Sequence, residues 1–206
     1  MAERPRGRAA ADPTATVVGA DWDGQDISGQ QHTGVTFVDL DLTDVTNVGA
    51  TFTECTFRNA RFNGSAHTDA AFVNCTFASC AFFDARFTDC KLVGSTFRRC
   101  TYDLFTVVGG NWSHVGLAGA DLRSATFRGT RMREADLTGA RCEGASIRDA
   151  DLSGAALRGA TLSRCDLRGS DLSAVEPAHV ALAGAIISFD QALVIAAALG
   201  LDVRPD

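Results

Sequence analysis

Seven cysteines and four histidines are the residues of this sequence that could bind a metal, form disulfides or act in catalysis. Their spacing fits none of these uses, because no Cys-x-x-Cys pair of the kind that holds zinc is present. Most of the cysteines are instead separated by multiples of five residues: Cys55, Cys75, Cys80, Cys90, Cys100 and Cys165. This period indicates equivalent positions in a structural repeat. We interpret the cysteines as small core residues, kept reduced in a cytoplasmic protein.

The histidines and the known catalytic motifs also give no support for an enzyme. The sequence contains no P-loop, nucleophile elbow, HExxH or dinucleotide fingerprint. His67 lies twenty residues after Asn47. Two interpretations of this pair stay open: a buried hydrogen-bonded pair, or a local flattening of the fold. The sequence therefore predicts no enzyme activity and no cofactor.

A five-residue repeat positions these side chains. Bulky residues, mostly Phe and Leu, recur every five positions from Trp22 to Ile187 without an insertion or a deletion. Two positions before each lies a mostly small residue, so the unit is A-(D/N)-L-x-x, as in residues 120–124 and 150–154. A period of five matches neither the 3.6 of a helix nor the 2.0 of a strand. The repeat requires another architecture.

This motif resembles the pentapeptide-repeat family over about four-fifths of the chain. The resemblance implies an all-β fold, a right-handed quadrilateral β-helix of about eight coils in which four repeats make one coil. It also implies that the bulky and small positions point inward. We expect residues 1–15 to be a disordered tail, residues 16–187 to form the β-helix, and residues 188–206 to form a C-terminal capping and dimerisation α-helix with its tail.

Residues twenty apart become stacked neighbours in such a coil. The phenylalanines of one face should form an internal ladder: Phe37, Phe57, Phe77 and Phe97. Cys55 should lie near Cys75, and Cys80 near Cys100, about 5 Å apart at the spacing of neighbouring strands. The weakest repeats lie at 105–112, where Phe105 takes a slot that elsewhere holds a small residue. A bulge is expected there.

The period changes after residue 187. Ser188 and Gln191 fit a capping box, and Gly200 fits a helix C-cap, so we predict a helix from Phe189 to Leu199. Its residues are apolar on every side, which indicates burial on more than one side. One side can close the open end of the coil and another requires a second molecule. The predicted dimer interface is Phe189, Leu193, Ala196, Ala197 and Leu201.

This C-terminal segment, with Val-Glu-Pro at 175–177 and Phe-Asp-Gln-Ala at 189–192, resembles the MfpA-like group of fluoroquinolone-resistance proteins and, more distantly, the Qnr group. The resemblance implies two solenoids joined end to end into a rod that mimics DNA, occupies the DNA-binding saddle of DNA gyrase, a type II topoisomerase, and confers resistance to quinolones or related topoisomerase poisons. Qnr proteins carry loops that the unbroken register leaves no room for. A scaffold that binds some other protein is the alternative, since fold alone does not assign function.

Charge limits the mimicry. Duplex DNA carries one charge per ~1.7 Å, so a rod of about 80 Å would carry roughly 47, whereas two chains of −6 carry about 12. Shape and local acidic patches must therefore supply the likeness. Asp151 and Asp171, stacked on one outer face, are the candidate gyrase contacts, with ordinary solvated side chains as the alternative interpretation.

Composition restricts the other partners. The net charge is −5 over residues 14–119, +2 over 120–170 and −4 over 171–206. Nucleic-acid binding needs a concentrated basic face, so we expect no direct nucleic-acid contact. The longest apolar run, residues 192–199, is shorter than the roughly 20 residues that cross a bilayer. We expect a cytoplasmic protein without membrane contact.

Overall fold

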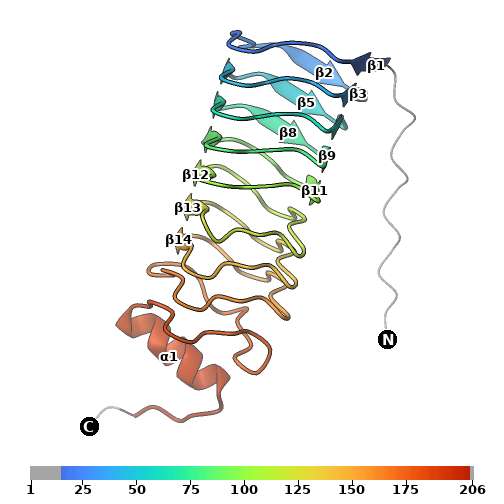
Figure 1. Ribbon diagram of the computed structural model, residues 1–206. Coiled ribbons are helices and arrows are strands. Elements are labelled where there is room, and N and C mark those ends of the chain that lie inside the picture. The colour runs from blue at the N-terminus through green and yellow to red at the C-terminus, as the bar shows by residue number, and fades with distance from the viewer. Residues whose placement is uncertain (1–14, 205–206) are drawn as a thin grey trace.

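The chain forms a right-handed quadrilateral β-helix with one helix at its C-terminal end, as Figure 1 shows. The computed structural model describes residues 15–204, so the predicted N-terminal tail lies, apart from its last residue, outside the described residues. Parallel pairing joins residues twenty apart, from Ala15 with Val35 to Asp166 with Ile186. Four pentapeptides therefore make one coil, as the repeat predicts.

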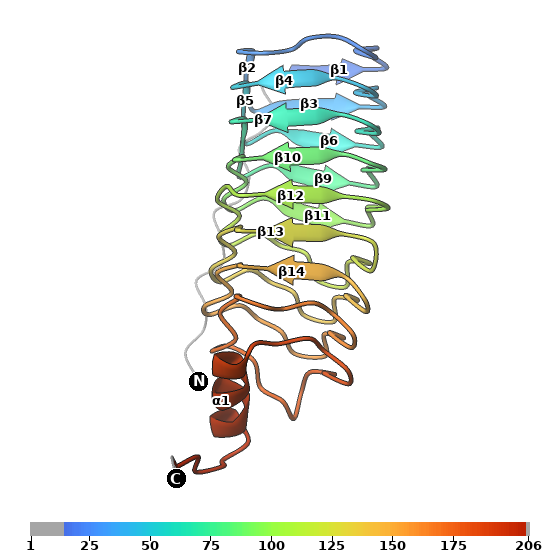
Figure 2. The same cartoon turned by 90° about the vertical axis from the view of Figure 1, so that its left-hand side faces the viewer.

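The coil has four faces, and three of them carry parallel sheets (Figure 2). The β1 face is β1 (Ala15–Val18), β3 (Val35–Val38), β6 (Thr56–Arg58), β9 (Thr76–Ala78) and β11 (Thr96–Arg98). The β2 face is β2 (Gln31–Thr33), β5 (Thr51–Thr53) and β8 (Ala71–Val73). The β4 face is β4 (Thr46–Val48), β7 (Ala66–Thr68), β10 (Arg86–Thr88), β12 (Thr106–Val108), β13 (Thr126–Arg128) and β14 (Ser146–Arg148). The fourth, the bridge face, is held by single-residue bridges such as Asp21 with Asp41.

The predicted phenylalanine ladder fills the core behind the β1 face. Phe37, Phe57, Phe77 and Phe97 are buried. Their ring centroids lie 5.1, 5.0 and 4.6 Å apart, with rings within 13° of parallel. Similar stacks line other faces, as between Phe52 and Phe72 at 4.9 Å. Rings on adjacent faces meet edge to face, so the core is a connected set of aromatic contacts.

The coil turns at the last residue of each repeat, which adopts a positive φ in most repeats. Asp39 and Asn59, both at φ 54°, are typical, and Asp, Asn and Gly tolerate this conformation better than other residues. The sharp corners are what make the cross-section four-sided.

The expected bulge at residues 105–112 is absent. Arg86 pairs with Thr106 and Lys91 with Asn111, so the twenty-residue register runs through this segment unbroken. Phe105 and Trp112 are fully buried. Gly110, in a slot that elsewhere holds a small residue, adopts φ 77°, and a Cβ there would lie 2.2 Å from the carbonyl oxygen of Cys90. The coil therefore requires glycine at this position.

The helix α1 runs from Phe189 to Ala198 and closes the C-terminal end of the coil (Figure 1). The predicted capping box is present: the Ser188 N–H donates to Gln191 Oε1 at 2.7 Å, and the Gln191 N–H to Ser188 Oγ at 3.4 Å. Gly200 at φ 79° ends the helix, and the Leu201 N–H donates to the Ala196 carbonyl, as in a Schellman motif. Both ends follow the sequence signals.

Candidate interaction surfaces

Two of the chemistry-bearing groups are internal. The Asn47 amide donates to His67 Nδ1 at 2.9 Å, His67 Nε2 lies 3.0 Å from Ser65 Oγ, and that hydroxyl donates to the Phe62 carbonyl at 2.7 Å. These hydrogen bonds require the His67 proton on Nε2, because Nδ1 accepts from Asn47 and the Ser65 hydroxyl already donates to Phe62. Burial lowers the pKa of His67 to about 3. The buried hydrogen-bonded pair is therefore the correct interpretation, and the histidine is a neutral core residue.

The cysteines are also core residues. All seven are free thiols, and only Cys100 is partly exposed. The Cys75 thiol donates to the Phe52 carbonyl at 3.3 Å, and the Cys80 thiol to the Phe57 carbonyl at 3.5 Å. The neighbouring Cys55 thiol, together with burial, raises the pKa of Cys75. Burial raises the pKa of Cys90 to about 12. Cys75 and Cys90 are therefore poor nucleophiles, whereas the neighbouring Cys75 thiol lowers the pKa of Cys55 to about 7. Residues 15–204 contain no group of three His, Cys, Asp or Glu side chains placed to hold a metal ion.

The predicted acidic pair lies in neighbouring coils on the β2 face, because the Asp171 N–H donates to the Ala150 carbonyl at 2.9 Å. The two carboxylates differ in their partners. Asp151 accepts from the Ser153 hydroxyl at 2.6 Å and pairs with Arg133. These contacts hold the pKa of Asp151 below its usual range. Asp171 accepts only the Ser173 N–H, at 2.8 Å, and has no ion pair among the described residues. Only Asp171 therefore presents an uncompensated charge.

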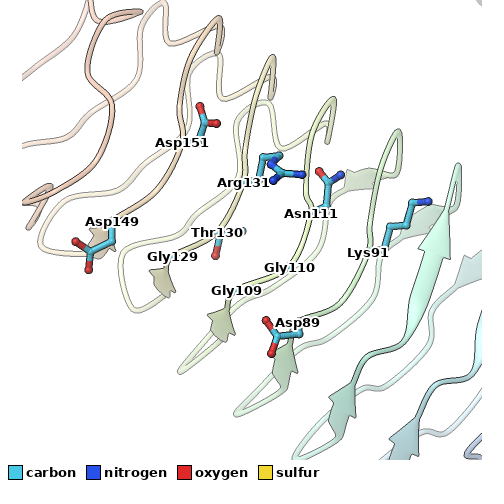
Figure 3. Close-up of a pocket in the computed structure, with 10 residues that line it drawn as sticks. All are labelled: Asp89, Lys91, Gly109, Gly110, Asn111, Gly129, Thr130, Arg131, Asp149 and Asp151. Atoms are coloured by element: carbon cyan, nitrogen blue, oxygen red, sulfur yellow. The ribbon is translucent and has the colours of Figure 1, made fainter.

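A hollow of about 570 Å³ lies beside Asp151, at the corner between the β4 and β2 faces. Its lining forms two rows, shown in Figure 3: Lys91, Asn111, Arg131 and Asp151 in one, and Asp89, Gly109, Gly129 and Asp149 in the other, with Gly110 and Thr130 between. The missing side chains of the glycines make the hollow. It carries charges of both signs, from Lys91 and Arg131 and from Asp89, Asp149 and Asp151.

Ion pairing divides the outer surface into two parts. From residue 120 onward most arginines neutralise a carboxylate, as Arg168 does with Asp166 at 2.7 Å and Arg123 with Asp121 at 2.7 Å. Before residue 110 only two carboxylates within the described range are ion-paired, Asp41 and Asp84. The others carry free charge: Asp21, Asp23, Asp26, Asp39, Asp44, Glu54, Asp69, Asp89 and Asp103. The acidic surface without ion pairs thus lies on the N-terminal coils. The net charge of that segment predicted an acidic region but not which carboxylates are unpaired.

The outer side of α1 exposes several large apolar side chains. Phe189 is 80% exposed, and Leu193 is 39% exposed. A hollow of about 590 Å³ is lined by Phe189, Leu193, Ala197, Leu201, Asp202, Val203 and Arg204. Four of the five predicted interface residues lie together there. The fifth, Ala196, is half-buried and does not line the hollow.

Gln191 is a residue of this region whose second role the sequence pattern did not reveal. Besides capping the helix, its side-chain amide donates to the carbonyls of Leu167 and Ser170, each at 2.7 Å. The side chain is buried. It fixes α1 against the last coil, with Ile195 packed on the core, and so holds the opposite side of the helix toward solvent.

Family models match residues 50–174 of the coiled region. A model described as a pentapeptide repeat region matches residues 50–127, and one described as pentapeptide repeats (8 copies) matches residues 117–154 and 135–174. Together these cover more than half of the chain. The chain belongs to the pentapeptide-repeat family.

Other pentapeptide-repeat proteins share the fold. Two trypsin-treated variants of QnrB1, a plasmid-mediated fluoroquinolone resistance protein, are 19% and 20% identical, with TM-scores of 0.75 and 0.73. The alignments cover 93% and 92% of this chain and 98% and 97% of those chains. Full-length QnrB1 is 18% identical, with a TM-score of 0.52 over 91% of this chain and 98% of that one. No curated protein matches the chain in sequence.

Within residues 15–204, no helix has the length and apolar character needed to span a membrane. The ten residues of α1 are about half of what a bilayer requires.

Proposed function

We propose that this pentapeptide-repeat protein is a cytoplasmic, non-enzymatic dimer that binds a type II topoisomerase, DNA gyrase in the first instance, in place of DNA. By doing so it confers resistance to quinolones or related poisons. The observation that carries the proposal is the apolar hollow on α1, at the end of a solenoid whose fold is similar to that of a fluoroquinolone resistance protein over nearly its full length.

The dimer follows from the position of α1. Gln191 holds one side of the helix on the last coil, while Phe189, Leu193 and Leu201 stay exposed. An apolar patch at the tip of an elongated molecule indicates a protein interface. A second copy presents the same surface, and a two-fold contact buries both patches at once. Two β-helices joined end to end in this way form a continuous rod.

The charge distribution specifies how such a rod would imitate DNA. The carboxylates without ion pairs gather on the N-terminal coils, which lie at the two far ends of the proposed rod. Near the dimer centre Asp171 is free, whereas Asp151 is compensated by Arg133. The mimicry would therefore combine rod shape with acidic ends, because total charge is far below that of a duplex.

A supercoiling assay with purified gyrase tests the proposal. We expect the wild-type protein to inhibit supercoiling at micromolar or lower concentration. Leu193→Asp should be monomeric by sedimentation and should inhibit at least tenfold less, because a carboxylate in the interface cannot be desolvated without a partner. Leu104→Asp is the matched control, since Leu104 is a 55% exposed leucine on the coil. Absence of inhibition at high excess of wild-type protein would instead support a scaffold for some other partner.

Charge reversal locates the contact. Asp151→Lys with Asp171→Lys tests the centre of the rod, and Asp23→Lys with Asp44→Lys tests its ends. If the acidic patches act, at least one pair should weaken inhibition tenfold or more without altering the dimer. Equal inhibition by both double variants and the wild type would show that these four carboxylates do not contribute to gyrase inhibition.

A further inference from the structure

A third hollow, of about 870 Å³, lies on the β1 face of the N-terminal coils. Arg58 and Arg98 occupy equivalent positions two coils apart, and the coil between them carries only Ala78 and Ser79 at those places. Arg99 stands at the adjoining corner. The rest of the lining is polar or small: Val38, Thr56, Asn59 and Thr76. We name this hollow the arginine notch.

The three arginines of the notch have no ion pair within residues 15–204. Nine other arginines in that range do have one: Arg61, Arg86, Arg123, Arg128, Arg133, Arg141, Arg148, Arg168 and Arg204. A cluster of unpaired guanidinium groups is unusual on a chain with a net charge of −6. The surrounding acidic coils could have supplied partners, yet the notch is left cationic.

Neighbouring groups add hydrogen-bonding capacity. The Thr56 and Thr76 side chains line the notch beside the arginines and are partly exposed. At the edge of the notch, the Asn59 amide donates to the Asp39 carboxylate at 3.2 Å. This carboxylate is therefore bonded to an amide and forms no ion pair with the arginines of the notch. The guanidinium groups are thus free to bind an outside carboxylate with two parallel hydrogen bonds.

We propose that the arginine notch docks an acidic segment of a partner protein, with two carboxylates about 10 Å apart, the height of two coils at ~4.8 Å each. The volume of the notch exceeds that of a single ion, and Arg58 and Arg98, two coils apart, set the spacing of the carboxylates that they would bind. A nucleic acid fits less well, because its affinity comes from neutralising many phosphates and the acidic coils around the notch would repel the rest of its backbone. This surface is separate from the α1 interface and does not rest on the proposed topoisomerase contact.

Fluorescence anisotropy with a labelled deca-glutamate peptide tests the notch at low salt. We expect the wild-type protein to bind the peptide, and Arg58→Glu and Arg98→Glu each to weaken binding about tenfold, the loss typical of a charged hydrogen-bonded contact. Arg98→Gln should show an intermediate loss, which guards against misfolding of the charge-reversed variant. Circular dichroism checks that the coil is intact.

Arg158→Glu is the matched control, because Arg158 occupies the same position on the β1 face in a later coil and also has no ion pair among the described residues. It produces the same change in net charge and should leave affinity within twofold. Three results would overturn the proposal: no binding by the wild type, an equal loss in Arg158→Glu, or tighter binding of a ten-nucleotide oligothymidylate than of deca-glutamate.

Discussion

The N-terminal and C-terminal coils follow one backbone plan with different side chains. Eleven of the 13 phenylalanines precede residue 110, and twelve of the fourteen described strands lie there as well. After β14 the coils continue on single-residue bridges with Leu and Ala inside, as between Thr161 and Ala181. On the surface, free carboxylates in the first part give way to arginine–carboxylate pairs in the second. The two halves are therefore suited to different tasks.

This difference separates the coils with the most aromatic packing from the end that carries the proposed dimer interface. Stacked rings and three-residue strands stiffen the half that presents free charge, whereas the other half carries α1 and the apolar hollow. In a repeat protein each coil contacts only its neighbours, so local stability can differ along the chain. We expect the aromatic half to resist unfolding longest and the leucine half to open first.

The largest expected effect is in the aromatic core. Phe77→Ala should lower the free energy of unfolding by about 3–5 kcal/mol, and Leu137→Ala, in the same column, by a smaller amount near 2 kcal/mol, because it removes fewer contacts and leaves a smaller cavity. Urea denaturation of both variants measures the difference. A leucine variant as damaged as the phenylalanine one would break the distinction between the halves.

Acid should weaken the aromatic half through His67. The native pKa of about 3 lies below the ordinary 6.5, so the unfolded chain binds a proton first as pH falls. Stability is then lost from pH 6.5 downward, by up to about 1.4 kcal/mol per pH unit, until the native histidine itself titrates. Melting between pH 7 and 4 should show this loss. Asn47→Leu with His67→Phe, which makes the column apolar, should flatten the profile, and an unchanged slope would exclude His67 as its cause.

A smaller effect is expected where α1 meets the last coil. Gln191→Ala removes two hydrogen bonds to the coil and half of the capping box, for a cost of about 1–3 kcal/mol. Amide exchange in residues 189–198 should accelerate before that of the coils. Gln25→Ala is the control, since the Gln25 amide makes one exposed hydrogen bond, to the Asp21 carbonyl. Similar exchange in both variants would show that Gln191 does not fix the helix.

The smallest effect should come from the ion pairs of the C-terminal coils. Arg133 is largely exposed where it meets Asp151, and exposed pairs contribute about 0–1 kcal/mol. We expect Arg133→Ala to change stability by less than about 1 kcal/mol in urea denaturation. A larger loss would mean that electrostatics, and not leucine packing, stabilise this half.

Much of the coil follows from the sequence because the period is strict. Every inward position obeys the same rule, so Phe77 and Cys75 could be placed without coordinates, and Ser188 with Gln191 marked the helix start. Around residue 110 the rule was insufficient. The unusual Phe105 was visible in the sequence, but the positive φ at Gly110 and its close approach to the Cys90 carbonyl depend on the backbone of the preceding coil.

The surface was less predictable than the core. The outward Asp or Asn of the repeat recurs in the sequence, but whether such a carboxylate is free depends on which arginine reaches it across coils. Arg133 lies eighteen residues before Asp151, a spacing that only the coil brings within contact. The arginine notch likewise comes from residues twenty and forty apart together with the small side chains between them. The net charge of a segment does not show which of its charged side chains pair or cluster across coils.

Displacement of DNA from gyrase tests the central claim most directly. A labelled duplex bound to purified gyrase would be titrated with the protein, and fluorescence anisotropy would follow its release. The account predicts that the wild-type dimer releases the duplex at micromolar or lower concentration, that Leu104→Asp does so equally, and that Leu193→Asp does not. Retention of the duplex at high excess of wild-type dimer, or release by the Leu193→Asp monomer at wild-type concentrations, would contradict it.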